Sequence, residues 1–252
     1  MTKERIDKVL KEIQTGNNPV RILFAVENGS RAWRIESNDS DWDVRFVYVR
    51  KMEDYLKIDK TLDVITKQFE DVDVVGFDVY KYCGLLKASN PTAIEWLRSD
   101  ILYYGEKPKE LIEFADNYFN PKALFWHYKS MGKSNYLKYI KSKEGVTYKK
   151  YLYAMRGLIN SRFVLKENKI PPIDFNITLE HMREDLPKHV YENLKKIIEF
   201  KKDSKEKQIV KNIVQVDNYI ESELKKVEEP QSIKRTQLND LFNNYILKEL
   251  EK

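Results

Sequence analysis

Short apolar segments of the kind that form β-strands occupy the first half of the chain. Residues 21–27 (RILFAVE) are almost continuously apolar, which predicts a buried strand. Residues 41–49 largely alternate between apolar and polar side chains, the pattern of a strand with one buried face. Residues 61–69 and 72–75 are two further candidates. This part of the chain is therefore expected to form a small β-sheet.

Helical periodicity precedes these strands and takes over after them. Residues 3–14 place apolar side chains three and four positions apart, and the same spacing returns from about Asp78. After Pro108 the strand signal fades. Six later segments fit helices, namely residues 109–118, 121–142, 147–168, 187–202, 207–227 and 232–250.

This order of elements predicts an α+β fold in two domains. Helices alone follow the strands, so the chain does not alternate strand with helix as a parallel α/β protein would. Residues 1–118 are expected to form the sheet-containing domain and residues 119–252 an all-helical C-terminal domain. A chain of 252 residues has room for two domains of modest size.

Charge divides the chain at nearly the same place. The net charge is +5, but residues 1–120 carry 18 Lys and Arg against 22 Asp and Glu, whereas residues 121–252 carry 27 against 18. The first part is thus acidic and the second is basic. A metal site next to a surface that binds a polyanion would show this asymmetry.

The sequence points to a reducing compartment without a membrane partner. Cys83 is the only cysteine, which leaves no disulfide within the chain, and its apolar neighbours predict a buried thiol. No apolar run approaches the roughly 20 residues that a membrane span needs. The first 14 residues also lack the apolar core of a signal peptide. We expect a cytoplasmic protein, whose oligomeric state the sequence does not indicate.

Two aspartates stand two positions apart at the start of the alternating strand. Asp41 and Asp43 would project from the same face, while Trp42 and Val44 take the other face into the core. Neighbouring carboxylates repel each other, and a divalent cation removes that repulsion. Mg²⁺ prefers a few carboxylates together with phosphate oxygens of a substrate. The pair therefore indicates phosphoryl chemistry in which two ions, about 4 Å apart, clamp the attacking and leaving oxygens.

A glycine-serine turn lies between the buried strand and the aspartate strand. Gly29 allows the backbone to approach a phosphate closely, and the Ser30 hydroxyl and nearby amide groups can donate to it. Ten residues separate Ser30 from Asp41. Each element alone is common, but a strand, Gly-Ser, this spacer and D-x-D in a second strand form a far more specific combination.

This arrangement resembles the DNA polymerase beta-like nucleotidyltransferase superfamily. The segments ENGSRAW and SNDSDWDVRFVYV are similar to its RNA-repair-associated branch, the RlaP family. The similarity continues through DVVGFDVYK, LLKASNPTAIEWL, KKYLYAMRGLINSRF and PPIDF, and so covers roughly residues 20–175. Where this chain has Arg34, the family usually has glycine. The resemblance implies a small mixed β-sheet core with helices, followed by a helical half.

The resemblance also implies a third carboxylate on a neighbouring strand. Asp73 has a valine on either side, which can face the core while the acid faces the site. Asp78 stands where helical periodicity begins, so its alternative role is a helix N-cap. With Asp73, the metal ligands would be Asp41, Asp43 and Asp73, binding two Mg²⁺ or Mn²⁺ ions. By resemblance, Asp43 and the third acid flank the attacking oxygen, whereas Asp41 holds the nucleotide-side ion.

Several further residues are candidates for binding the nucleotide: Gly29, Ser30, Arg31, Lys81, Lys149, Tyr153 and Arg156. The last three stand at i, i+4 and i+7 of a predicted helix and would form one stripe. Related enzymes present such a stripe to the triphosphate and base, although a solvent-exposed helix face would show the same spacing. Arg31 could contact phosphate or pair on the surface with Glu36 or Asp39.

The start of the basic half combines lysines with aromatic residues. Residues 121–150 contain eight lysines and one acid. Six Phe, Trp and Tyr residues are interleaved with them: Phe125, Trp126, Tyr128, Tyr136, Tyr139 and Tyr148. Binding of single-stranded nucleic acid uses phosphate attraction and stacking on bases. A helix with an aromatic core face and a solvated lysine face would have the same composition.

We therefore expect a metal-dependent nucleotidyltransferase that transfers NMP from an NTP to a hydroxyl and releases pyrophosphate. The 3′ end of an RNA, such as a tRNA, is the favoured acceptor. Transfer to a protein or a small molecule, as in toxin-type or antibiotic-modifying relatives, is the alternative within the same fold. A nucleotide- or RNA-binding protein without catalysis is the alternative from another class, against which the intact acids argue. The sequence does not indicate which NTP is used.

Overall fold

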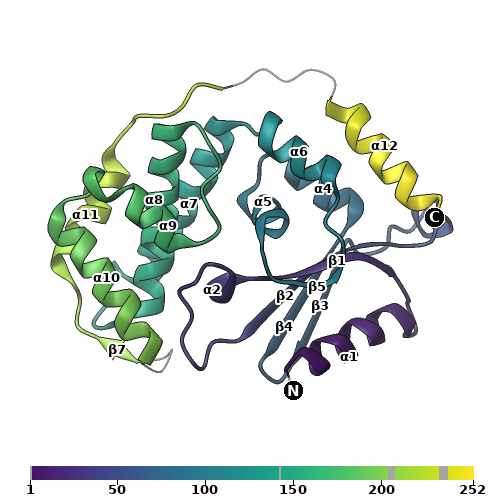
Figure 1. Ribbon diagram of the computed structural model, residues 1–252, viewed down its shortest axis with the longest axis horizontal. Helices are drawn as coiled ribbons and strands as arrows, with labels where there is room; N and C mark the ends of the chain where they lie inside the picture. The colour runs from purple at the N-terminus through teal and green to yellow at the C-terminus, as the bar shows by residue number, and fades with distance from the viewer. Residues whose placement is uncertain (1, 142, 204–207, 233–237) are drawn as a thin grey trace. The chain divides into compact units, whose positions relative to one another are not determined.

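The computed structural model describes residues 2–141, 143–203, 208–232 and 238–252. The chain divides into two compact units. The first, here called the sheet unit, comprises Met1–Ala32, Asp41–Tyr118 and Lys234–Lys252. The second, the helical unit, comprises Trp33–Ser40 and Phe119–Ile233. Figure 1 labels most of the elements of both.

The sheet unit is built on a five-stranded sheet with the strand order β3-β4-β2-β1-β5. Its strands are β1 (Arg21–Asn28), β2 (Trp42–Val49), β3 (Val64–Phe69), β4 (Val72–Asp78) and β5 (Leu102–Gly105). The β2–β4 pair is parallel and the other pairs are antiparallel. The sheet is therefore mixed, which confirms the predicted α+β class.

Helices cover the apolar residues of this sheet. The helices of the unit are α1 (Thr2–Thr15), α2 (Gly29–Ala32), α3 (Met52–Tyr55), α4 (Val79–Lys87), α5 (Pro91–Arg98), α6 (Lys109–Tyr118) and α12 (Leu238–Leu250). Ile6 and Leu10 of α1 belong to one buried cluster with Val44 and Phe46 of β2. Elsewhere Phe77 of β4 stacks on Trp96 of α5, with ring centroids 4.4 Å apart. Val44, Phe46 and Tyr48 thus face this cluster as the alternation predicts, while Val47 and Val49 are buried as well.

The helical unit contains α7 (Pro121–Tyr139), α8 (Tyr148–Glu167), α9 (Phe175–His181), η1 (Arg183–Asp185), α10 (Lys188–Asp203) and α11 (Val214–Lys225). A two-stranded ribbon, β6 (Val146–Thr147) with β7 (Ile209–Val210), accompanies them. The segment 207–227, predicted as one helix, therefore contains strand β7 before helix α11 begins at Val214. Parts of three predicted helices, at residues 142, 207 and 233–237, lie outside the described residues.

Two segments fall in a different unit from the one expected for a division at residue 118. The C-terminal helix α12 lies in the sheet unit, where Phe242 packs edge-on against Phe114 of α6 at 4.5 Å between centroids. Trp33–Ser40, between the Gly-Ser turn and Asp41, lies in the helical unit. Lys201 of α10 donates to the Ile35 carbonyl, and the Phe175 amide donates to the Trp33 carbonyl at 3.1 Å. Packing between segments distant in sequence decides both placements.

The structure bears on the expected state of Cys83 and on the length of the helices. Cys83 is a buried free cysteine, as predicted, and burial raises the pKa of its thiol to about 12. Within the described ranges, the helices are all too short or too polar to cross a membrane.

The helices α7 and α8 approach each other closely at two glycines. A Cβ added to Gly157 would lie 2.6 Å from the Gly132 nitrogen and 2.8 Å from the Tyr128 carbonyl oxygen. We expect Gly157→Ala to lower the free energy of unfolding by about 1–3 kcal/mol, since backbone atoms must move apart. Gly84→Ala in α4 is the matched control, because a Cβ there meets nothing within 4 Å. It should raise stability by about 0.5–1 kcal/mol. Equal effects of the two variants in urea denaturation would contradict the close approach.

Candidate active site

The Gly-Ser turn and Asp43 meet at one end of the β1–β2 pair. The turn follows β1 directly, and the register pairs Asn28 with Asp43. Gly29 has a φ of +68°, and a Cβ there would lie 2.0 Å from Oδ2 of Asp43. The carboxylate of Asp43 therefore lies directly against the Gly29 backbone. Ser30 is buried beside it, at 3% exposure.

Asp73 adjoins Asp43 on the next strand. In the parallel β2–β4 pair, Asp43 and Asp73 are register partners, so their side chains leave the sheet on the same side. Asp41 is exposed and stands immediately before β2. The structure thus places Asp73 beside Asp43, one of the two aspartates that the sequence singled out.

Asp78 lies at the opposite end of β4. It is the N-cap of α4, where its side chain accepts from the Tyr80 amide at 2.9 Å and from the Tyr55 hydroxyl at 2.7 Å. Burial raises the pKa of its carboxyl, while these two hydrogen bonds oppose the rise. The register pairs Asp78 with Tyr48, five residues along the strands from the Asp43–Asp73 pair. The structure therefore gives Asp78 the capping role and leaves Asp73 as the acid next to Asp43.

Arg45 lies between the two carboxylates. Its Nη2 donates to Oδ1 of Asp43 at 2.7 Å and to Oδ2 of Asp73 at 2.8 Å. Its Nη1 donates to the carbonyls of Asp73 at 2.8 Å and Val44 at 3.0 Å. Since a single nitrogen touches both carboxylates, their oxygens are close enough for one cation to contact both.

The donor set at this position suits a hard divalent cation that shares its ligands with a substrate. In the part of the chain that the structure describes, no group of three or more His, Cys, Asp or Glu residues is arranged to hold a metal. Mg²⁺ is commonly bound by only one or two carboxylates plus substrate phosphates. The carboxylates of Asp43 and Asp73, which converge next to the buried Gly29–Ser30 backbone, fit that mode of binding.

Glu27 supports Asp43 from the neighbouring strand. It is fully buried, and its Oε1 accepts the Asp43 amide at 2.9 Å while its Oε2 accepts the Tyr103 hydroxyl at 2.5 Å. Burial raises the pKa of Glu27 to about 7, although both hydrogen bonds favour the carboxylate. Glu27 therefore acts as a structural partner of the backbone at Asp43.

Arg31 lies next to the aspartate strand. Its guanidinium stacks on the Trp42 ring at 4.0 Å, and its Nε donates to the Asp41 carbonyl at 3.2 Å. These contacts hold a positive charge beside Ser30 and Asp41. By contrast, Lys81 of α4 pairs with Asp63 at 3.0 Å, near Asp78 and apart from the Asp43 end of the sheet.

The predicted stripe on α8 surrounds a tryptophan within the helical unit. The Arg156 guanidinium lies 3.6 Å from the ring centroid of Trp33, and Tyr153 meets the same ring edge-on at 5.4 Å. Lys149 lies over Tyr153 at 5.6 Å. Arg156 is only 3% exposed, so this part of the stripe is not a solvated face. Arg156 and Tyr153 contact Trp33 and so hold the segment that connects the Gly-Ser turn to Asp41.

Arg34, in the same segment, has a left-handed φ of 58°. This conformation favours glycine, because an L side chain is strained there. We expect Arg34→Gly to be more stable than Arg34→Ala by about 1 kcal/mol, because both remove the side chain and only glycine relieves the strain. Guanidinium denaturation of the two variants measures the difference. Equal stabilities would show that the backbone there is unstrained.

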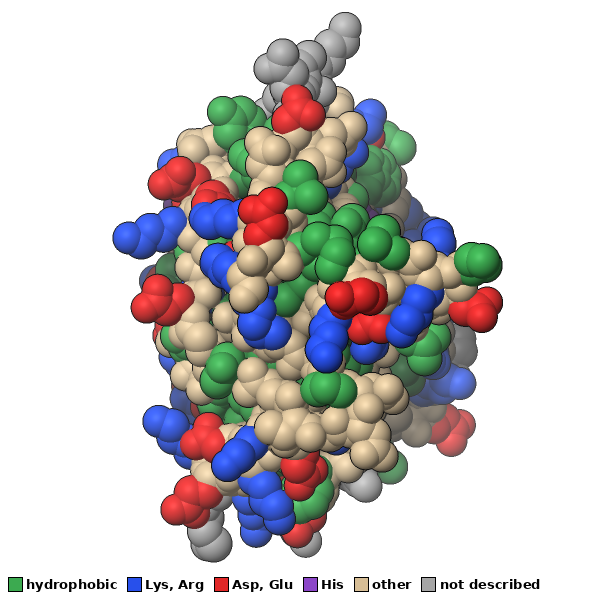
Figure 2. Space-filling view, turned by 90° about the vertical axis from the view of Figure 1, so that its right-hand side faces the viewer, with side chains coloured by type: hydrophobic (Ala, Val, Ile, Leu, Met, Phe, Trp, Pro, Cys, Tyr) green, Lys and Arg blue, Asp and Glu red, His purple; other side chains and the backbone are tan. Residues whose placement is uncertain are grey.

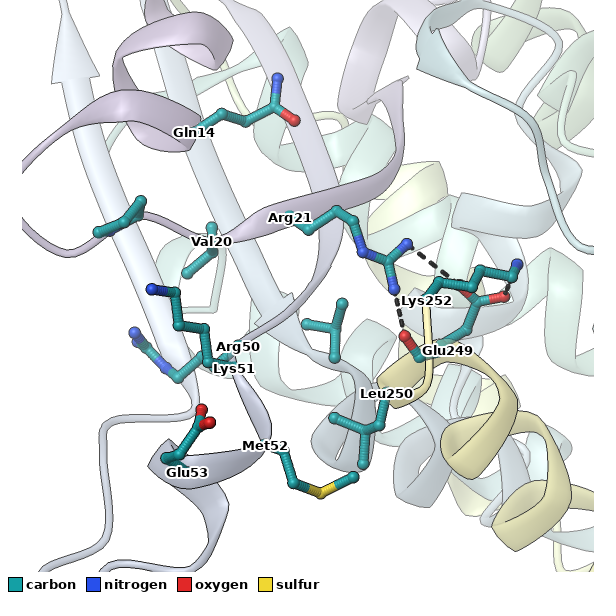
Figure 3. A pocket seen from close by; sticks show the side chains of 12 residues that line it. Gln14, Val20, Arg21, Arg50, Lys51, Met52, Glu53, Glu249, Leu250 and Lys252 are labelled. Atoms are coloured by element: carbon teal, nitrogen blue, oxygen red, sulfur yellow. Dashed lines mark hydrogen bonds and ion pairs between the residues drawn. The ribbon is translucent and has the colours of Figure 1, made fainter.

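A hollow of about 610 Å³ lies at the other end of β1 and β2 (Figure 3). Arg21, Arg50 and Lys51 line it, and Arg21 pairs with Glu249 of α12 at 3.2 Å. Arg21 begins β1 and Arg50 follows β2, so the length of the strands separates this hollow from the acids. Basic and acidic side chains are interspersed on the face shown in Figure 2. None of the residues predicted for the site lines the hollow.

Sequence reasoning did not single out Arg45 or Trp33. The alternation of residues 41–49 places Arg45 on the same face as Asp41 and Asp43, but it gives no sign that the guanidinium reaches Asp73 on another strand. Tyr103 lies on β5, a short strand that the pattern did not predict. The partnership of Trp33 with α8 joins residues more than a hundred positions apart, and no local pattern reports it.

Comparisons with known proteins agree with this geometry. Residues 2–247 match the family described as RlaP, RNA repair pathway DNA polymerase beta family. The uncharacterized protein YcgL of Bacillus subtilis (strain 168) is 33% identical over 255 residues, which cover 99% of this chain and 96% of the relative. The chain is also similar to a crystal structure of spectinomycin adenyltransferase AAD(9) from Enterococcus faecialis with ATP and spectinomycin. That likeness covers 88% of this chain and 99% of the other, with a TM-score of 0.52 and 14% identity, and shows a shared fold.

Proposed function

The chain belongs to the RNA repair pathway DNA polymerase beta family, RlaP, and we propose that it transfers NMP from an NTP to the 3′ hydroxyl of an RNA. The observation that carries this proposal is that Asp73 converges on Asp43, whose carboxylate lies against the Gly29 backbone. Carboxylates beside a turn whose amide groups can bind phosphate suit metal-assisted phosphoryl transfer.

The acids would hold the metal. Asp41, Asp43 and Asp73 would bind two Mg²⁺ or Mn²⁺ ions together with the triphosphate, as two-metal sites for phosphoryl transfer do. When bound, such ions neutralise charge that develops on the transferred phosphoryl group and lower the pKa of the attacking hydroxyl.

The remaining chemistry falls to side chains around the turn. The Gly29 and Ser30 amides and the Ser30 hydroxyl would bind the triphosphate, and Arg31 would add a charge next to it. The acceptor oxygen forms a bond to the α-phosphorus while the bond to the α–β bridging oxygen breaks, and pyrophosphate leaves. The hydroxyl proton passes toward Asp73. In this proposal, Asp73 and its neighbour Asp43 lie on the side of the acceptor hydroxyl.

The helical unit offers exposed groups for an RNA acceptor. Phe125, Tyr128 and Tyr136 are buried, so they belong to the core. Other aromatic residues remain accessible and lie beside lysines. Lys150 and Lys138 lie 3.7 Å and 5.0 Å from the Tyr139 ring centroid.

A second accessible group is the stacked pair of Tyr148 and Phe200. Their ring centroids are 6.0 Å apart, and Phe200 is 56% exposed. Rings of this kind stack on bases while lysines neutralise phosphates. Together with the net positive charge of residues 121–252, these groups favour RNA over an uncharged small molecule.

The location of transferred label tests the acceptor class. The full-length protein is incubated with Mg²⁺, each α-labelled NTP in turn, and a mixture of small RNAs, cell protein and low-molecular-weight metabolites. We expect the label in the RNA fraction, in a form that 3′ exonuclease removes. Label in protein or in the small-molecule fraction would replace the RNA proposal with the corresponding alternative. No label in any fraction would contradict transferase activity.

Lys150 allows a sharper test of the RNA surface. We expect Lys150→Gln to weaken RNA binding about equally for all sequences and to reduce the salt slope of log K by about 1, because one phosphate contact is lost. Lys188→Gln is the matched control, since Lys188 is an exposed lysine of the same unit, in α10. Fluorescence anisotropy at several salt concentrations measures both. If the salt slopes of the two variants were equal, the RNA-binding surface would not include Lys150.

A further inference from the structure

Arg45 is more deeply embedded in the acidic site than a surface counterion would be. Its side chain is 14% exposed and makes four hydrogen bonds, all to groups of β2 and β4. Two of them reach the carboxylates of Asp43 and Asp73, whose side chains are 23% and 31% exposed. The guanidinium therefore fills the space between two acids that would otherwise repel each other.

The same space is where a divalent ion would contact both acids. A guanidinium nitrogen at 2.7 Å and 2.8 Å from the two oxygens leaves no room for a metal ion between them. Two cations at one position would also repel each other strongly. An ion that bridges Oδ1 of Asp43 and Oδ2 of Asp73 thus requires that Nη2 leave.

The other half of the guanidinium is anchored independently of the acids. Nη1 donates to the carbonyls of Val44 and Asp73, neither of which is a carboxylate group. The side chain can therefore turn about these bonds and release the two carboxylates while it stays beside the site. A lysine ammonium lacks this fork of donors, so it would hold either the carbonyls or the carboxylates.

We propose that Arg45 is a positioning residue that holds Asp73 against Asp43 before metal binds and is displaced from between them as a divalent ion enters. Arg45 and the ion then compete for the same two carboxylates. This inference rests on the proposed function, since it assigns the ion to the same acids. Its consequence is that the acids stay aligned without metal, and that metal affinity is kept low until a nucleotide supplies further ligands.

Metal affinity without nucleotide or RNA tests the competition. Mn²⁺ binding is titrated by electron paramagnetic resonance on the full chain, for the wild type, Arg45→Met and Arg45→Lys, with Arg50→Met as a control at the far end of β2. We expect Arg45→Met to bind Mn²⁺ about tenfold more tightly, within the usual range of coupling between two ligands. Arg45→Lys should lie between Arg45→Met and the wild type, and Arg50→Met should match the wild type.

Thermal unfolding supplies a second measurement on the same variants. Without metal, Arg45→Met should melt below the wild type, and the difference should shrink as Mg²⁺ is added, because the ion takes over the role of the guanidinium. A difference that stays constant at all Mg²⁺ concentrations would overturn the proposal, as would equal or weaker Mn²⁺ binding by Arg45→Met. Tighter Mn²⁺ binding without any NMP transfer would instead contradict the proposed function and leave the role of Arg45 standing.

Discussion

Asp43→Asn is expected to lower the rate of NMP transfer at least about a thousandfold, the loss typical when electrostatic stabilisation of a transition state is removed. The substitution keeps the size of the side chain, and the amide of residue 43 can still donate to Glu27. It removes the charge that Arg45 contacts at 2.7 Å and that a metal would need. Initial rates with an α-labelled NTP measure the effect.

Asp54→Asn is the control for this result. Asp54 lies on α3 of the same unit and pairs with Lys57 at 2.6 Å, away from the acidic site. We expect it to retain wild-type activity. If Asp43→Asn remained within tenfold of wild type while both variants were folded, the acids would not be the catalytic site.

Gly29→Ala is expected to have the second largest effect on activity. A methyl group there would lie 2.0 Å from Oδ2 of Asp43, and the φ of +68° is strained for alanine. The carboxylate must move by more than an ångström, which should lower the rate about a hundredfold, as misplacement of a reacting group does. The loss should appear in kcat, with stability lowered by about 1–2 kcal/mol.

The control for Gly29→Ala is Gly84→Ala, which adds the same methyl group in open space. Its kcat should be unchanged. A Gly29→Ala enzyme with wild-type kcat would show that Asp43 does not act from its position against the turn.

Local patterns predicted most of the sheet. The apolar run of β1 and the alternation of β2 located both strands, and the mixed α+β class is confirmed. The likeness of ENGSRAW and SNDSDWD to the RlaP family is confirmed and extends beyond residues 20–175 to nearly the whole chain. β5 was not predicted, because four residues are too few to show a period.

Contacts between distant segments could not be predicted in the same way. The sequence allowed both Asp73 and Asp78 as the third acid, and only the β2–β4 register shows which lies beside Asp43. Trp33 packs with Arg156, and Phe242 packs with Phe114. The segment Trp33–Ser40 therefore lies in the helical unit and α12 in the sheet unit, whereas a single boundary at residue 118 would assign each to the other unit. Such placements depend on tertiary packing, which local periodicity does not encode.

Crystals soaked with Mn²⁺ and a non-hydrolysable NTP test the central claim most directly. We expect anomalous density for an ion about 2.1 Å from carboxylate oxygens of Asp43 and Asp73, with the Arg45 guanidinium moved aside. The triphosphate should lie against the Gly29–Ser30 backbone. A nucleotide bound in the hollow beside Arg21 and Arg50, with no ion at Asp43, would contradict the account.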